Sequence, residues 1–402
     1  MSNEIYMILN QHRIYKPDII IIYGSLLLIL LVWMAYRRII WRKKNYAEHA
    51  GLFHTINRSW FPIIGVGIAA LATYKPIVSP GIDWFEDANR ILPLQQFHDF
   101  GKIPFLDTFS SHAFSDFGPG ALFSFLNGYN PLGGFVYQFI IPVLVTLVIY
   151  QLVLRITENG LIALFIALFY PYSDFILPTY YNFVPVSILA LLNLYRKQSV
   201  GNYFLFFLTA VLMIFWRIDL GSANLIACVV ALLFLCNTAP GFDTDIKKLF
   251  KGFGIVAAGS LLIFLITALL YNGSLSLRIS EVLGYISSFQ SYGLRDLASQ
   301  KDIKYYSLYF VLPLLVIAAG AYAIHRISRN KENSAQNNKL ALAIIFLCVF
   351  FFANFQRGLI RHTLAEQWDT ALTSYGFFIL ASTVFFSSRF QTNKTLGFFT
   401  FI

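Results

Sequence analysis

The chain has 402 residues, of which 57% are hydrophobic and 12% are charged, whereas roughly a quarter of the residues in an ordinary soluble domain are charged. The apolar residues form continuous runs of membrane-spanning length, so we predict an all-α polytopic membrane protein and not a soluble one. The net charge of +10 is divided among short basic clusters between these runs. That distribution is typical of topology signals and argues against nucleic acid as a partner.

We interpret residues 1–402 as a single transmembrane domain with about 11 transmembrane helices. The first apolar run has no basic n-region or small-residue cleavage site, so residues 1–59 should hold a retained extra helix and a basic cytoplasmic loop. The short runs 159–171 and 181–195 are typical of broken or re-entrant helices. The predicted spans are 18–36, 60–77, 132–154, 159–171, 181–195, 202–216, 220–236, 252–271, 306–325, 340–355 and 369–388.

Lys and Arg predict the orientation of these spans. The basic cluster RRIIWRKK at 37–44 follows the first span, and basic residues recur in every second loop after it. By the positive-inside rule these loops are cytoplasmic. The acidic residues concentrate in the intervening loops, which we therefore expect on the other face of the bilayer.

The longest of the non-cytoplasmic loops, 78–131, is predicted to form amphipathic helices on the membrane surface. If its start is helical, Asp83, Glu86, Asp87 and Arg90 share one helix face. A carboxylate held there could act as a general base towards a hydroxyl acceptor. Acids at a helix start also complement the helix dipole. Spacing alone does not choose between the two interpretations.

Further along the same loop are two histidines and three aspartates, which could suggest a metal site. Their spacing matches no standard ligand set, and a scattered polar surface is the simpler interpretation. Pro104 and the run Gly118–Gly120 predict turns between short helices. The five residues are His98, Asp99, Asp107, His112 and Asp116.

Polar residues also stand where later helices should emerge on this face. Asp174 lies between two apolar runs, among tyrosines. Arg217 and Asp219 lie between two spans that have almost no loop. An ion pair at membrane depth is costly unless partnered, so this pair is either an internal structural pair or part of a site.

The third polar position, FQRGLIRHTLAEQWD, contains Arg357, Arg361 and His362. Arginine suits phosphate because its planar fork donates two hydrogen bonds and stays charged. Interfacial snorkelling is the alternative. Because the positive-inside rule disfavours cations on this face, we interpret the two arginines as ligands for a lipid-linked phosphate.

A helix followed by a large first extracytoplasmic loop with acids near its start resembles the GT-C superfamily of integral membrane glycosyltransferases. The stretch from Asp83 to Asp116 is similar to bacterial members with an acid-rich start, then G-x-x-P-Y-x-D, then a histidine. Two later groups, at 217–221 and 357–362, resemble further short motifs. The pattern falls here on Glu86, Asp87, Gly101, Pro104, Phe105 in place of Tyr, Asp107, His112, Arg217, Asp219, Gly221, Arg357, Arg361 and His362.

The resemblance implies a GT-C-like fold in a bacterial inner membrane, with the active site on the extracytoplasmic side. It implies inverting transfer of a hexose or pentose from a polyprenyl-phosphate donor to a cell-surface glycan, lipid or protein. Whether a divalent metal, Mg²⁺ or Mn²⁺, takes part is left open. The implied base is Asp83, Glu86 or Asp87. The implied donor-phosphate ligands are Arg217, Arg357, Arg361 and His362, and the implied substrate contacts are Asp107, His112, Asp116, Asp174 and Asp219.

Two other functions fit the same charges. A transporter or flippase of lipid-linked glycans would also need charge in a cavity, although such proteins usually have repeats and midplane charges, which this sequence lacks. A polymerase or ligase of surface polysaccharide would share the donor but not the single-sugar transfer.

Overall fold

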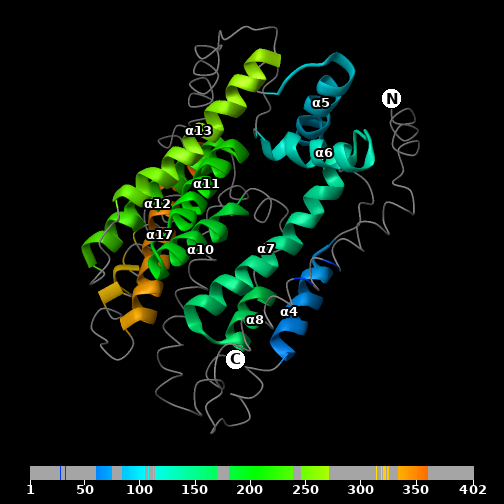
Figure 1. The fold of residues 1–402 in the computed structure, drawn as a ribbon. Coiled ribbons are helices and arrows are strands. Elements are labelled where there is room, and N and C mark those ends of the chain that lie inside the picture. Colours follow the sequence, from blue (N-terminus) through cyan, green and yellow to red (C-terminus); the bar gives the residue numbers. More distant parts are fainter. Residues whose placement is uncertain are drawn as a thin grey trace, which may run out of the picture. The chain divides into compact units, whose positions relative to one another are not determined.

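The computed structural model describes residues 60–74, 84–104, 107, 112, 114–169, 181–238, 246–270 and 334–360, with single positions at 28, 32, 314, 318, 320–322, 324 and 325. These residues are mostly helical, and no strand occurs among them (Figure 1). The chain divides into two compact units, Met1–Thr179 and Tyr180–Ile402. Each unit is described by itself.

Unit 1 is built on the long helix α7, which packs against α4, α6 and α8, while α5 packs on α6. Helix α7 turns into α8 through Glu158, which has a left-handed backbone (φ 55°). The side chain of Asn159 then accepts hydrogen bonds from the amides of Leu161 and Ile162 and so begins α8. The helices of unit 1 are α4 (Phe61–Ala72), α5 (Trp84–Phe100), α6 (Phe114–Asn127), α7 (Gly133–Thr157) and α8 (Gly160–Phe169).

Glycines allow two close approaches in unit 1. Gly120 of α6 and Gly134 of α7 lie against each other's backbones, and Gly65 of α4 lies against the side chain of Leu164. The prediction of turns at Gly118–Gly120 is wrong, because this run lies inside α6. Its small residues permit helix packing instead of ending the helix.

Unit 2 is a bundle in which α12 packs against α10, α11 and α17, and α13 packs on α11. Asn338 of α17 donates a hydrogen bond to the hydroxyl of Tyr195 at the end of α10 (3.2 Å). Tyr181, just before α10, meets Phe350 of α17 edge to face. These two contacts make α17 antiparallel to α10. The helices are α10 (Phe183–Arg196), α11 (Val200–Trp216), α12 (Ile218–Thr238), α13 (Ile246–Leu270) and α17 (Ser334–Ile360).

Helix α12 has two contrasting faces. Its buried face carries small residues, and its exposed face carries large apolar ones. Small residues let helices approach closely, whereas exposed branched residues suit an apolar surrounding. The buried face includes Ala223, Ala227 and Ala231, and the exposed face includes Leu225, Ile226, Val229, Val230 and Leu233.

Within the described ranges, two helices are long and apolar enough to cross a membrane, Gly133–Thr157 and Ile218–Cys236. Several other apolar helices are shorter. Helices α4, α7, α8, α10, α11, α12, α13 and α17 coincide with predicted spans, and α5 and α6 confirm that the predicted loop 78–131 contains helices. The predicted spans 18–36 and 369–388 lie wholly or almost wholly outside the described residues, and so does the larger part of 306–325.

Candidate functional site

The acidic start of the long loop falls on the first turns of α5. Glu86 and Asp87 are helical, which is the condition set for a shared helix face. Their side chains lie outside the described residues together with the whole of Asp83. Arg90, one turn further, places its guanidinium 5.7 Å from the ring centre of Phe135. Such a cation–π contact stabilises by roughly 0.5–1 kcal/mol when partly exposed. It joins this part of α5 to the start of α7.

The motif at 101–107 forms a helix end followed by a turn. Gly101 has φ +63°, and its amide and that of Lys102 donate to carbonyls of the last turn of α5. This is the glycine-ended helix terminus expected where a left-handed residue follows the helix. Asp107 then closes the turn, because its carboxylate accepts the amide hydrogen of Ile103 over 2.8 Å. Two of the motif's predicted residues therefore have a structural role in this loop.

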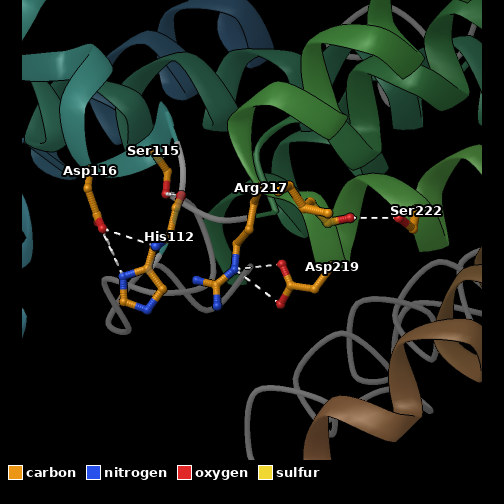
Figure 2. A network of polar contacts seen from close by, with 7 residues as sticks. His112, Ser115, Asp116, Arg217, Asp219 and Ser222 are labelled. Atoms are coloured by element: carbon orange, nitrogen blue, oxygen red, sulfur yellow. Dashed lines mark hydrogen bonds and ion pairs between the residues drawn. The ribbon is translucent and has the colours of Figure 1, made fainter. Parts of the chain in front are cut away.

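His112 and Asp116 are brought together at the start of α6 (Figure 2). Both are buried, and Asp116 is completely so. The carboxylate accepts the backbone amide of His112 at 3.2 Å, and its Oδ2 lies 3.2 Å from the ring Nδ1. Ser115 donates to the carbonyl of His112 over 2.6 Å.

Burying a carboxylate is costly unless it is hydrogen-bonded. The amide and ring nitrogens of His112 and the positive end of α6 offset that cost for Asp116. A carboxylate at Nδ1 also fixes the orientation of an imidazole, which is how enzymes position a histidine for proton transfer or substrate contact.

Arg217 and Asp219 form the second polar contact, in unit 2 (Figure 2). Arg217 Nε donates to Oδ1 of Asp219 at 2.9 Å and lies 3.3 Å from Oδ2. Arg217 is buried, whereas the Asp219 side chain is 43% exposed. Arg217 alone separates α11 from α12, in an extended conformation. The charged pair thus lies where α11 and α12 meet.

Helix packing explains why the group at 217–221 ends in a glycine, Gly221. A Cβ atom at Gly221 would meet the backbone of Ile214 and Met213 at 2.3–2.7 Å, so only glycine lets α12 start so close to α11. The ring of Trp216 also meets that of Phe183 at the start of α10. The starts of α10 and α12 therefore lie at the same end of unit 2.

Helix α17 brings Arg357 towards the same end. Its residue Asn338 lies beside the end of α10, and its residue Phe350 lies beside Tyr181 at the start of α10. Arg357 follows Phe350 by two helical turns, which is about 10 Å along the axis. We call this end of unit 2, with Tyr181, Asn182, Arg217, Asp219 and the turn of α17 that carries Arg357, the Arg217 end.

The remaining predicted site residues, Asp174, Arg361 and His362, lie outside the described residues. Of Arg357 the structure describes the helical backbone. No group of three His, Cys, Asp or Glu side chains that could hold a metal occurs among the positions that the structure describes. The side chains of the acids at 83, 86 and 87 are not among those positions.

Buried polar residues inside unit 2 were missed by the sequence analysis. Asn224 of α12 and Ser187 of α10 are completely buried, and Asn224 Nδ2 lies 3.9 Å from Sγ of Cys228. The amide oxygens of Asn182 and Asn224 have no hydrogen-bond partner in the described part of the chain. The sequence did offer a signal for Asn224, since it is an asparagine inside the apolar run 220–236. A polar residue at membrane depth is often functional.

A second missed feature joins α5 to the loop before α7. The ring of His98 stacks on that of Tyr129, with centroids 3.6 Å apart and planes within 7°. His98 Nδ1 lies 2.8 Å from the carboxylate of Asp99. Burial, and to a smaller extent the charge of Asp99, raises the pKa of the Tyr129 hydroxyl above 10.0.

Comparison with known proteins finds no family model that matches the chain, no similar curated protein and no similar solved structure.

Proposed function

We propose that this protein is a GT-C-like membrane glycosyltransferase. It moves a sugar from a polyprenyl-phosphate donor to an extracytoplasmic glycan, lipid or protein. The observation that carries the proposal is the Arg217 end of unit 2, where α11, α12 and α17 bring a buried arginine, its aspartate partner and the Arg357 turn to one end of an apolar bundle.

A lipid-linked phosphate needs cations beside an apolar surface. Arginine is suited to it, since each charge-assisted hydrogen bond contributes roughly 1.5–3 kcal/mol. Asp219 holds Arg217 through Nε, and this fixes the plane of the guanidinium. The exposed apolar face of α12 begins within two turns of Arg217, so a polyprenyl chain bound there would meet branched aliphatic residues.

The sugar-transfer step needs a base for the acceptor hydroxyl. We assign it to Asp83, Glu86 or Asp87 at the start of α5, with His112, Asp116, Asp107 and Asp174 as substrate contacts or supports. In inverting transfer the acceptor oxygen forms the new bond to the anomeric carbon, the bond from that carbon to the phosphate oxygen breaks, and the acid takes the hydroxyl proton. The carboxylate that takes the proton becomes a carboxylic acid. The leaving polyprenyl phosphate keeps the electron pair of the broken bond as an anion and is stabilised by the arginines.

The bilayer and its sides are part of the same proposal. The apolar faces of α12 and α13 support a membrane-embedded bundle. The exposed basic residues Arg196, Lys197, Lys247 and Lys251 stand at the opposite end from Arg217, which supports an extracytoplasmic Arg217 end.

The donor assignment can be tested by native mass spectrometry of the purified full-length protein and its co-purifying lipid. Arg217→Lys, Arg357→Gln and Arg361→Gln should each reduce bound polyprenyl-phosphate sugar several-fold. Arg196→Lys replaces an exposed arginine at the opposite end without changing its charge and serves as the matched control. If the three arginine variants keep the lipid as well as the control does, the donor site is not at this end.

A transporter of lipid-linked glycans is the alternative that one observation favours. The buried polar atoms of Asn182, Ser187 and Asn224 run inward from the Arg217 end, as a polar path through a bundle would. Reconstituted protein decides between the functions. A transferase consumes the donor and releases polyprenyl phosphate, whereas a flippase moves intact donor between leaflets. A polysaccharide polymerase or ligase would instead release products longer by more than one sugar.

A further inference from the structure

The end of unit 2 opposite Arg217 is strongly basic. Six of its described residues are Lys or Arg, and three different helices or helix ends contribute them. We call this group the basic end. Its members are Arg196 and Lys197 at the end of α10, Lys247, Lys248 and Lys251 in the first two turns of α13, and Lys339 near the start of α17.

Helix packing holds the residues of the basic end close together at the same end of the bundle. Gly252 of α13 lies against Tyr203 and the amide of Phe204, at distances that leave no room for a Cβ atom. Phe253 also meets Phe207 of α11, with ring centres 5.3 Å apart. The first turns of α13 are therefore fixed against the first turns of α11.

The turn between α10 and α11 is fixed as well. The side-chain amide of Asn202 donates to the carbonyls of Lys197 and Asn193, at 2.7 and 3.2 Å, and ties the α10–α11 turn to α11. The hydrogen bond from Asn338 to Tyr195 brings the start of α17 to the same turn. The basic end is thus built by tertiary contacts and not by one basic segment alone.

This concentration of like charge is unfavourable by itself. Lys247 and Lys251 are spaced i, i+4, and Lys248 and Lys251 i, i+3, which places like charges on one face of α13. No acid lies at this end among the described residues of unit 2. In the sequence, Asp243 and Asp245 precede α13 and Glu332 precedes α17, and the six basic residues outnumber these three acids. A bound anion would relieve the repulsion.

The surface next to these charges is apolar. Phe250 and Phe253 are 64% and 50% exposed, and exposed Ile255 and Leu261 follow along α13. A ligand that fits both the basic residues and the apolar surface beside them has an anionic head and hydrocarbon chains. We propose that the basic end binds the headgroups of anionic phospholipids in the adjoining leaflet, with the acyl chains lying along α13. This inference rests on the membrane embedding proposed above, but it is separate from the sugar-transfer step.

The test uses the full-length protein in neutral detergent, titrated with phosphatidylglycerol or with phosphatidylcholine of the same acyl chains, and read by native mass spectrometry. Phosphatidylglycerol should bind more tightly. The variant K247Q/K248Q/K251Q should lose roughly fivefold in affinity for each lysine, or about 100-fold in all at low salt. K247R/K248R/K251R keeps the charge and should bind as the native protein does.

Three results of these titrations would overturn the proposal, and a competition experiment adds a fourth. They are equal binding of the two lipids, unchanged phosphatidylglycerol binding by the glutamine variant, or loss of binding in the arginine variant despite a native unfolding transition. Inorganic phosphate added at the lipid concentration should not displace phosphatidylglycerol, because it gains nothing from Phe250 and Phe253. Full displacement would make this a plain anion site and would also refute the lipid assignment. No measurement here involves sugar transfer, so failure of the lipid assignment would leave the sugar-transfer proposal standing.

Discussion

Gly221 lies so close to the preceding helix that a Cβ atom on it would be 2.3 Å from the Cα of Ile214. The obstacle is backbone, which cannot rotate away as a flexible side chain can. The close approach allows a single residue, Arg217, to join two helices and places that residue against Asp219. The geometry of the charged pair therefore depends on a glycine that carries no charge.

Replacing this glycine should damage the hairpin. We expect Gly221→Ala to lower the free energy of unfolding by about 1–3 kcal/mol, the usual cost of overpacking. Gly259→Ala in α13 is the matched control, since a Cβ there meets nothing within 4 Å. It should be neutral or slightly stabilising, because alanine favours helix. Thermal unfolding in detergent measures both. Equal stability of the two variants would contradict the close packing at Gly221.

The Arg217–Asp219 pair should behave as a coupled unit. Asp219→Asn removes the countercharge of a buried arginine and should destabilise the protein by roughly 1–3 kcal/mol. The double variant Arg217→Met/Asp219→Asn should be less destabilised than the sum of the two single variants. Unfolding of all four proteins gives the coupling energy. Additive effects would show that the 2.9 Å contact contributes nothing to stability.

Asp107 should act through the turn it closes. Asp107→Ala removes the acceptor for the amide of Ile103 and should cost about 1 kcal/mol of stability. Asp107→Asn keeps an acceptor oxygen and should be close to native. If the alanine variant is fully stable but loses bound donor lipid, Asp107 contacts substrate directly and its role in the turn is incidental.

Tyr129 should lose its phenol proton at a higher pH than an ordinary tyrosine does. Its pKa in the folded protein lies above the unfolded value of 10.0, so the folded state keeps the phenol proton when the unfolded chain has lost it. Stability is thus unaffected below pH 10 and falls as the pH rises from there towards the folded pKa. Tyrosinate absorbance, with Tyr129→Phe subtracted, follows this group.

Asp99→Asn should shift the Tyr129 titration only part of the way back towards 10.0, because burial is the larger of the two causes. A complete return would mean that the charge of Asp99 dominates. No change at all would mean that the carboxylate does not act on Tyr129.

The long-range apolar pattern was enough to locate most described helices of both units. Runs such as 202–216 and 220–236 are almost purely apolar, and their helices α11 and α12 begin and end within a few residues of the prediction. The turn predicted at Gly118–Gly120 failed because local turn propensity ignores neighbours. Gly120 lies against Gly134 of another helix, and that packing favours a helical glycine.

The polar residues were harder to interpret. Spacing paired Arg217 with Asp219, which are two residues apart. It did not pair His112 with Asp116, although both were named, because that contact depends on where α6 begins. Nor could it join His98 to Tyr129, which belong to different segments of the chain. Asn224 was overlooked because hydropathy averaged over a span conceals one polar side chain.

The one-residue joint between α11 and α12 also makes this part of the chain intolerant of any change in length. Inserting one residue beside Arg217 would turn α12 by about 100° about its axis. The alanines at 223, 227 and 231, which are now buried, would rotate towards the surroundings, and branched side chains such as Ile226 and Leu233 would rotate into the bundle. Insertions and deletions at this hairpin should therefore be far less well tolerated than substitutions on the exposed face of α12.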